Sequence, residues 1–225
     1  MNTTTAIVFA VCGTGLLSIV LLLVVLAARS LSETAKKNEA WPEFARSIGG
    51  RWFPGTAGRV DRIEAQFRGW PAYVDTCLTS MDKRLVNYTR MRVFYRSFVP
   101  FELHLNDSVR IDETGLAAGQ LNKQVFLCEP GRQVQYVASD NALAVQMLTS
   151  ELRDMFCHIR QSDIQIRRRR QWHDTGVSSS IYEVVVHRDG VVVDFDELTC
   201  LWSALTAVLV RLDELGVAGQ LAGNS

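Results

Sequence analysis

The stretch at residues 182–195 reads Tyr-Glu-Val-Val-Val-His-Arg-Asp-Gly-Val-Val-Val-Asp-Phe and carries the strongest local structural signal in the chain. Two runs rich in β-branched residues flank Asp189-Gly190, and a two-residue Asp-Gly loop between such runs is preferred in type I′ β-hairpins. We therefore predict two paired strands here, with Val186 opposite Val193 on the core side. A hairpin at this point would place the C-terminal half of the chain in an antiparallel sheet.

A leucine-rich helix is expected directly after this stretch. It begins near Asp196-Glu197, because acidic side chains in the first turn suit the helix dipole, and it ends at Gly216. Its apolar residues recur at helical spacing: Leu198, Leu201, Trp202, Leu205, Val208, Leu209, Leu212 and Leu215. The uncharged centre is too short to cross a bilayer, so we expect a helix of the core.

Alternating residues predict further strands upstream. In Tyr88–Ser97 the apolar side chains share one face, whereas Arg90, Arg92 and Arg96 share the other. Other strands are expected at 59–67, 72–78, 101–105, 125–127, 134–137 and 163–169, and a helix is expected at 140–158. Helices on one face of a mostly antiparallel sheet fit this order, so the predicted fold class is α+β with two or three helices.

The N-terminal stretch 6–28 contains no charged residue. As a helix it would span about 35 Å, enough for a bilayer core of ~30 Å, and we predict a transmembrane helix. Basic residues follow the stretch, beginning with Arg29, and none precedes it. The positive-inside rule therefore places the short N-terminus 1–5 outside and the large domain in the cytoplasm. The alternative is a signal peptide cleaved near Val25-Leu26-Ala27, although its basic n-region is missing.

The rest of the chain is divided into a juxtamembrane helical linker at 29–49, an α+β domain at 50–216 and a flexible tail at 217–225. Within the predicted span, small residues recur at every fourth position and line one side of the helix: Ala6, Ala10, Thr14 and Ser18. Such a stripe lets two transmembrane helices approach closely, which favours a helix-mediated homodimer. The alternative is that the spacing arises by chance in an alanine-rich span.

Composition excludes some classes of protein. The 24 basic and 24 acidic residues cancel, so no long-range field marks the whole chain as a polyanion binder. Five cysteines stand at wide, irregular spacings with no CxxC pair: Cys12, Cys77, Cys128, Cys157 and Cys200. This pattern is typical of buried, reduced cysteines in a cytosolic domain.

Two groups of arginines are candidates for contact with an anionic surface. Arg167, Arg168, Arg169 and Arg170 end a predicted strand, and Arg90, Arg92 and Arg96 share one strand face. Near a membrane, basic residues attract anionic headgroups, and the two groups would act together if their strands lay side by side. The alternative is that these arginines pair with nearby carboxylates. Trp172 could stack on a base, but neutral charge and attachment to a bilayer argue against nucleic acid as a partner.

No stretch matches a catalytic or cofactor motif. His187 and Asp194 would lie diagonally on the expected hairpin, close enough for an ion pair or for part of a catalytic site. No two histidines have the spacing of a zinc motif, and no glycine-rich loop carries the lysine of a phosphate site. We therefore expect no cofactor and no bound metal. The enzyme alternative is a hydrolase-like site assembled from scattered residues, with His187, Asp194 and His173 as the first to test.

Three segments resemble uncharacterised bacterial proteins in which a small α+β domain follows one transmembrane helix. The first is Phe44–Trp52, where a helix runs into a strand through Gly49-Gly50. The second is Ser139-Asp140-Asn141 with the apolar positions that follow, and the third is Val193–Leu198 before the leucine-rich helix. The resemblance implies an architecture and no activity. The membrane that we predict for the anchor is a bacterial inner membrane.

A full-sized domain without a catalytic constellation favours a non-catalytic interaction module held at the inner face of a membrane. Its partner would be a protein or the headgroup layer. A regulator that contacts anionic lipids through Arg167–Arg170 is a further alternative, as is the enzyme described above.

Overall fold

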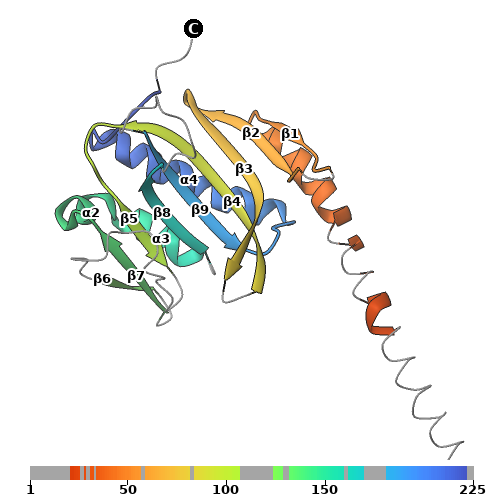
Figure 1. Ribbon diagram of the computed structural model, residues 1–225. Coiled ribbons are helices and arrows are strands. Elements are labelled where there is room, and N and C mark those ends of the chain that lie inside the picture. The colour runs from red at the N-terminus through yellow and green to blue at the C-terminus, as the bar shows by residue number, and fades with distance from the viewer. Residues whose placement is uncertain are drawn as a thin grey trace, which may run out of the picture.

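A computed structural model of the chain describes residues 21–25, 28, 31–32, 34–56, 59–81, 84–106, 124–128, 132–159, 162–169 and 181–221 (Figure 1). Most of the predicted span at 6–28 therefore lies outside the described residues, as does the expected loop at 107–123. Among the residues that are described, no helix combines the length and the apolar character needed to cross a membrane.

The domain is built on a large antiparallel sheet. Its strands are β1 (Arg51–Phe53), β2 (Arg62–Phe67), β3 (Trp70–Met81), β4 (Arg84–Ser97), β5 (Leu103–Asn106), β6 (Gln124–Cys128), β7 (Arg132–Ala138), β8 (Ser162–Arg168), β9 (Ile181–Asp189) and β10 (Ala218–Gly219). They lie in the order β1-β2-β3-β4-β9-β8-β5-β7-β6, and β10 pairs with β4 off this path. The central strands are β4, β9 and β8, and β1 and β6 form the two edges.

Helices pack on one face of this sheet. They are α2 (Asn141–Met147), α3 (Ser150–His158) and α4 (Phe195–Glu214), and α4 crosses behind β4 and β9 in Figure 1. Leu198, Leu201 and Leu205 of α4 are fully buried, as are Met91 and Val93 of β4. The predicted α+β class with a mostly antiparallel sheet and several helices is thus confirmed.

The helix at 34–47 belongs to this core. The Trp41 indole donates to the Val192 carbonyl at 2.9 Å, and the Phe44 ring lies 6.2 Å from the Trp202 ring, centre to centre. Trp41 and Phe44 are both fully buried. The stretch expected to link the membrane to the domain therefore contributes two large side chains to the interior of the domain.

The hairpin predicted around Asp189-Gly190 is wrong. β9 forms as expected, but Val191–Asp194 is not a strand, and Gly190 instead donates its backbone N–H to the Asn87 carbonyl at 2.9 Å. The reason is that β9 pairs with β4 on one side and with β8 on the other, so neither edge is open to a hairpin partner. Local sequence cannot reveal which edges more distant strands occupy.

The helix predicted at 140–158 is divided in two. α2 ends at Met147, and the Thr149 side chain accepts a hydrogen bond from the Leu152 backbone N–H at 3.3 Å, as an N-cap does for a new helix. The tail expected to be loose from Val217 also differs, because Val217 and Ala218 are buried and Ala218 pairs with Ser97 of β4.

Cys128 and Cys157 are joined by a disulfide, which corrects the expectation that these cysteines are reduced. The bond connects the edge strand β6 to the last turn of α3, with 5.4 Å between the Cα atoms. It ties the outer hairpin of the sheet to the helical layer. The two cysteines are 29 residues apart in sequence, so spacing alone gave no sign of the pair.

Candidate functional site: a charged face of the sheet

The sheet face opposite α4 carries polar and charged side chains, and we call it the polar face. Its members on strands β3, β4, β5, β8 and β9 are Tyr73, Asp75, Arg90, Arg92, Phe94, Arg96, His104, Asp163, Gln165, Arg167, Glu183, Val185 and His187. They alternate with the buried apolar residues of the same strands, as the period of a half-buried strand requires. None of the described helices packs on this face.

Asp75 forms the first cluster, on β3 and β4. The Arg90 guanidinium donates to both carboxylate oxygens at 2.8 and 2.9 Å, and Arg92 donates to Oδ2 at 2.6 Å. Burial alone would lower the pKa of Arg90, but the hydrogen bonds to Asp75 outweigh it and raise that pKa. Burial and the neighbouring Arg90 charge lower the pKa of Arg92. Both arginines therefore pair with the Asp75 carboxylate.

Glu183 forms the second cluster, on β9 and β8. Arg167 donates from Nε to Glu183 at 2.8 Å and from Nη1 to the Gln165 side chain at 2.8 Å. Glu183 is buried, whereas the Arg167 side chain is partly exposed. Arg167 is thus held along the sheet surface by two partners.

Asp163 forms the third cluster, between two histidines. Its Oδ1 contacts Nε2 of His104, and its Oδ2 lies 3.6 Å from Nδ1 of His187 and accepts from the Gln165 amide at 2.5 Å. Burial alone would raise the pKa of Asp163, but the hydrogen bonds from His104 and His187 outweigh it and lower the pKa to about 2. The carboxylate is therefore ionised at neutral pH.

Two further arginines lie at the end of the polar face where β4 and β8 finish. The Cζ atoms of Arg169 and Arg92 lie 4.7 and 5.6 Å from the centre of the Phe94 ring. The Cζ atom of Arg96 lies 6.0 Å from the centre of the Phe98 ring. Arg96, Arg169 and Phe98 are exposed. A guanidinium over an aromatic face gains cation–π attraction while its N–H groups stay accessible.

The charges of the polar face nearly cancel within the three clusters. Three arginines face three carboxylates there, so the charges of these six groups cancel. The exposed Arg96 and Arg169 add two positive charges at one end. The centre of the polar face is therefore neutral and hydrogen-bonded. One end of it, which we call the margin, carries arginine and aromatic side chains: Arg96, Arg169, Phe94 and Phe98.

The structure divides the two predicted groups of arginines. Arg90 and Arg92 pair with Asp75, and Arg167 pairs with Glu183, in line with the alternative that the arginines meet nearby carboxylates. Arg96 and Arg169 reach solvent on the polar face. Arg168 is exposed too, but strand alternation places it on the opposite face, in register with Tyr182. Arg170 lies outside the described residues.

A single strand, β9, separates the two predicted groups of arginines. β9 lies between β4 and β8, and a three-strand stretch of this kind is about 10 Å wide between its outer strands. Arg169 of one group and Arg92 of the other therefore meet at the same Phe94 ring.

The expected pairing of His187 with Asp194 is wrong. The Asp194 side chain accepts from the Glu197 backbone N–H at 2.8 Å and caps α4, while the acidic neighbour of His187 is Asp163. His173 lies outside the described residues. Within the described part of the chain, no three His, Cys, Asp or Glu side chains are grouped so that they could hold a metal ion.

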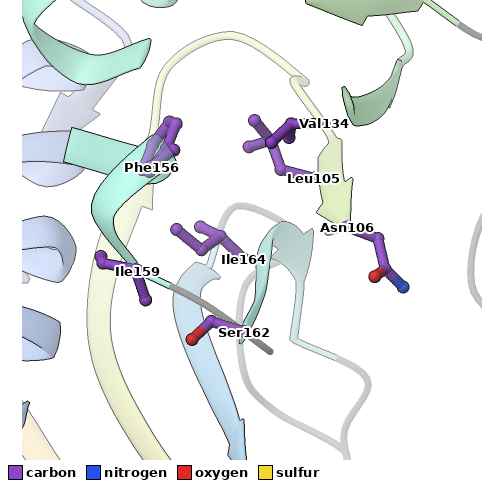
Figure 2. Close-up of a pocket in the computed structure, with 7 residues that line it drawn as sticks. All are labelled: Leu105, Asn106, Val134, Phe156, Ile159, Ser162 and Ile164. Atoms are coloured by element: carbon purple, nitrogen blue, oxygen red, sulfur yellow. The ribbon is translucent and has the colours of Figure 1, made fainter. Parts of the chain in front are cut away.

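A small pocket lies on the other face of the sheet, between α3 and strands β5, β7 and β8. Figure 2 shows Phe156 and Ile159 on one side of it and Leu105, Val134 and Ile164 on the other. Its volume is about 10 Å³, about the space that one water molecule needs. A substrate would not fit there.

Sequence reasoning missed Asp75, His104, Asp163 and Glu183, the residues that organise the polar face. Each occupies a polar position of an alternating strand, and that signal was present in the sequence. Their partners lie on other strands, so the pairing depends on a register that only the folded sheet supplies.

Comparison of this chain with protein-family models, with curated proteins and with solved structures finds no match.

Proposed function

We propose that this protein is a non-catalytic interaction module held at a membrane by residues 6–28, and that its polar face binds an acidic surface of a protein partner. The anchor is proposed from the uncharged length of that stretch, which suffices for a bilayer core. Basic residues after it favour an outside N-terminus and a cytoplasmic domain in a bacterial inner membrane. The small-residue stripe within it supports a homodimer of anchors.

The observation that carries the proposal is the exposed pair Arg96 and Arg169 at the margin of the polar face. Arginine and aromatic residues are enriched at protein interfaces, and here Phe94 and Phe98 lie under the two guanidinium groups. The aromatic rings restrict the arginine side chains before binding, which lowers the entropy lost on association.

The three ion-pair clusters support the same proposal. The Arg90–Asp75 pair joins β4 to β3, the Arg167–Glu183 pair joins β8 to β9, and the contact of His104 with Asp163 joins β5 to β8. The carboxylates of these clusters are therefore all paired. Acidic groups that would repel an acidic partner are therefore already neutralised. A partner carboxylate that approaches Arg96 or Arg169 finds exposed N–H donors.

The experiment is an affinity purification of the full-length protein from its own host in mild detergent, followed by mass spectrometry. A control chain lacks residues 33–225 and keeps the anchor. We expect one partner at near-stoichiometric amounts that the control does not retain. Recovery of the protein alone, or only with itself, contradicts the proposal.

A second candidate is an enzyme, and the His104–Asp163–His187 cluster is the observation that favours it. A carboxylate between two imidazoles can orient a general base. Tyr88 lies beside this cluster, with its ring centre 6.4 Å from that of His187, and burial, with the nearby Asp189 charge, raises the pKa of its phenol. Turnover of a test substrate that His187→Gln abolishes, in a variant that still folds, would favour the enzyme over the module.

A further inference from the structure

The N-terminal helix is tied to the loop between β1 and β2. Lys37 donates to the Asp61 carboxylate at 2.5 Å, and the other oxygen of Asp61 accepts from the Gly55 backbone N–H at 2.9 Å. Thr56 and Arg59 form a backbone bridge in the same loop. The loop is thereby fixed beside the N-terminal end of the helix, the end that continues toward residues 6–28.

The direction of β1 brings more of the chain to this end. β1 starts at Arg51, four residues after the helix finishes, and Figure 1 shows it beside the helix. Phe53, its last residue, pairs with Arg62, the first residue of β2. The end of the β1–β2 hairpin therefore lies toward the anchor.

Basic and apolar side chains gather at this end, and we call them the anchor-side patch: Lys36, Phe53, Arg59, Val60 and Arg62. Lys36, Arg59 and Val60 are exposed, and Val60 keeps 58% of its surface accessible. The Cζ atom of Arg62 lies 5.4 Å from the centre of the Phe53 ring. Of the described acids here, Asp61 and Glu64 are paired with Lys37 and Arg62, and Glu39 is exposed on the helix three residues after Lys36.

Chain length places this patch close to a bilayer. Residues 34–47 are helical, and Lys37 stands nine residues after the end of the proposed anchor at residue 28. If those nine residues were helical throughout, they would rise about 13 to 14 Å. The headgroup region beyond the hydrocarbon is about 5 to 8 Å deep on each side. The Lys37–Asp61 salt bridge would then stand about 5 to 9 Å above the headgroups, a height comparable to the Debye length of about 8 Å at physiological ionic strength.

We infer that the anchor-side patch contacts anionic lipid headgroups beside the anchor and orients the domain on the membrane; this rests on the anchor of the proposed function. Lys36 and Arg59 supply the charge, and Val60 is the exposed apolar side chain next to Arg59. Arg62 lies opposite Asp75 in the pairing of β2 with β3, so the patch adjoins the polar face at that edge, whereas Arg96 lies near the end of β4 and Arg169 follows β8.

The test uses the full-length protein reconstituted into vesicles of phosphatidylcholine, with or without phosphatidylglycerol. A photo-crosslinking amino acid replaces Val60, and lipid adducts are measured by mass spectrometry. Val145 on α2 is the matched control, because it is also a valine with 58% exposure and lies at the other end of the sheet from the N-terminal helix (Figure 1).

We expect adducts at position 60 in vesicles with phosphatidylglycerol and far fewer at position 145. Lys36→Gln and Arg59→Gln should each lower the yield at position 60 about fivefold, the factor that corresponds to one basic residue near an anionic surface. Equal adduct yields at positions 60 and 145 would overturn the inference, as would a yield at position 60 that is the same with and without phosphatidylglycerol.

A carbonate wash of the same vesicles distinguishes failure of the anchor-side patch from failure of the anchor. Protein that resists the wash but gives no excess of adducts at position 60 refutes the patch and leaves the anchor in place. Protein that the wash removes refutes the anchor on which the patch depends.

Discussion

Asp75 lies directly opposite Arg90 in the pairing of β3 with β4, and its carboxylate accepts both ends of the Arg90 guanidinium fork, at 2.8 and 2.9 Å. The carboxylate is almost fully buried, with 4% of the Asp75 surface exposed. A planar, bidentate pair of this kind is stronger and more specific than a single charged contact. It fixes the register at the centre of the polar face.

Removing the Asp75 charge should destabilise the domain. Asp75→Asn leaves Arg90 and Arg92 half-buried without their carboxylate, and we expect a loss of about 2 to 3 kcal/mol in the free energy of unfolding. Glu64→Gln is the control, because the Arg62–Glu64 pair is exposed and worth under about 1 kcal/mol. Urea unfolding measures both. Equal losses would mean that Asp75 does not hold the sheet in this way.

Acid should weaken the domain through Asp163. The pKa of this carboxylate is about 2 in the folded chain, against an ordinary value of 3.8. A lowered pKa adds stability that is fully present above pH ~4 and is lost as the pH falls toward ~2, and the shift corresponds to about 2 kcal/mol.

The comparison is between the wild-type protein and Asp163→Asn, unfolded in urea at a series of pH values. The stability gap between them should narrow as the pH falls from ~4 toward ~2. A gap that stays the same down to the acid limit would show that the histidines do not stabilise the ionised carboxylate.

Reduction of the disulfide should destabilise the outer part of the sheet. The bond closes a loop of about 30 residues, for which chain entropy gives about 3 to 4 kcal/mol. Reductant should lower the urea midpoint of the wild-type protein. It should leave the double variant Cys128→Ser, Cys157→Ser unchanged, while Cys200→Ser keeps the wild-type response. If reductant leaves the urea midpoint of the wild-type protein unchanged, the disulfide does not stabilise the outer part of the sheet.

The same disulfide tests the proposed side of the membrane. Structural disulfides persist in oxidising compartments and are rare in the cytosol, whereas the basic residues after the anchor favour the cytoplasm. Thiols can be blocked with a maleimide in intact cells at harvest, and the state of Cys128 and Cys157 then read by mass spectrometry. An oxidised pair in cells, the state that the structure shows, would reverse the proposed topology, whereas a reduced pair would support a cytoplasmic domain.

Asp194 should behave as a helix cap. Asp194→Ala removes the acceptor for the Glu197 N–H and should cost about 1 kcal/mol, whereas Asp194→Asn keeps an acceptor and should cost much less. Thermal unfolding of the two variants measures the difference. Similar losses in both would point to a role for the Asp194 charge, as the predicted ion pair with His187 would require.

The sequence predicted those parts of the fold that depend on local periodicity. Alternation identified β4 and placed Arg90, Arg92 and Arg96 on one face, and helical spacing identified α4. The hairpin failed because β9 is occupied on both edges by strands distant in sequence. No local pattern reports such competition.

The site was less accessible to prediction than the fold, because its contacts cross between strands. His104 and Asp163 meet only because β5 and β8 pair, and Cys128 meets Cys157 only because α3 packs near β6. The arginines could be named as candidates from the sequence, but which of them were already paired followed from the register of the folded sheet.

The most direct test of the central claim compares two adjacent arginines. In the purification of the full-length protein, the amount of partner retained is measured for Arg169→Glu, on the polar face, and for Arg168→Glu, on the opposite face. The account predicts that Arg169→Glu loses the partner and that Arg168→Glu keeps it at the wild-type level. Equal retention by the two variants would show that the polar face is not the binding surface.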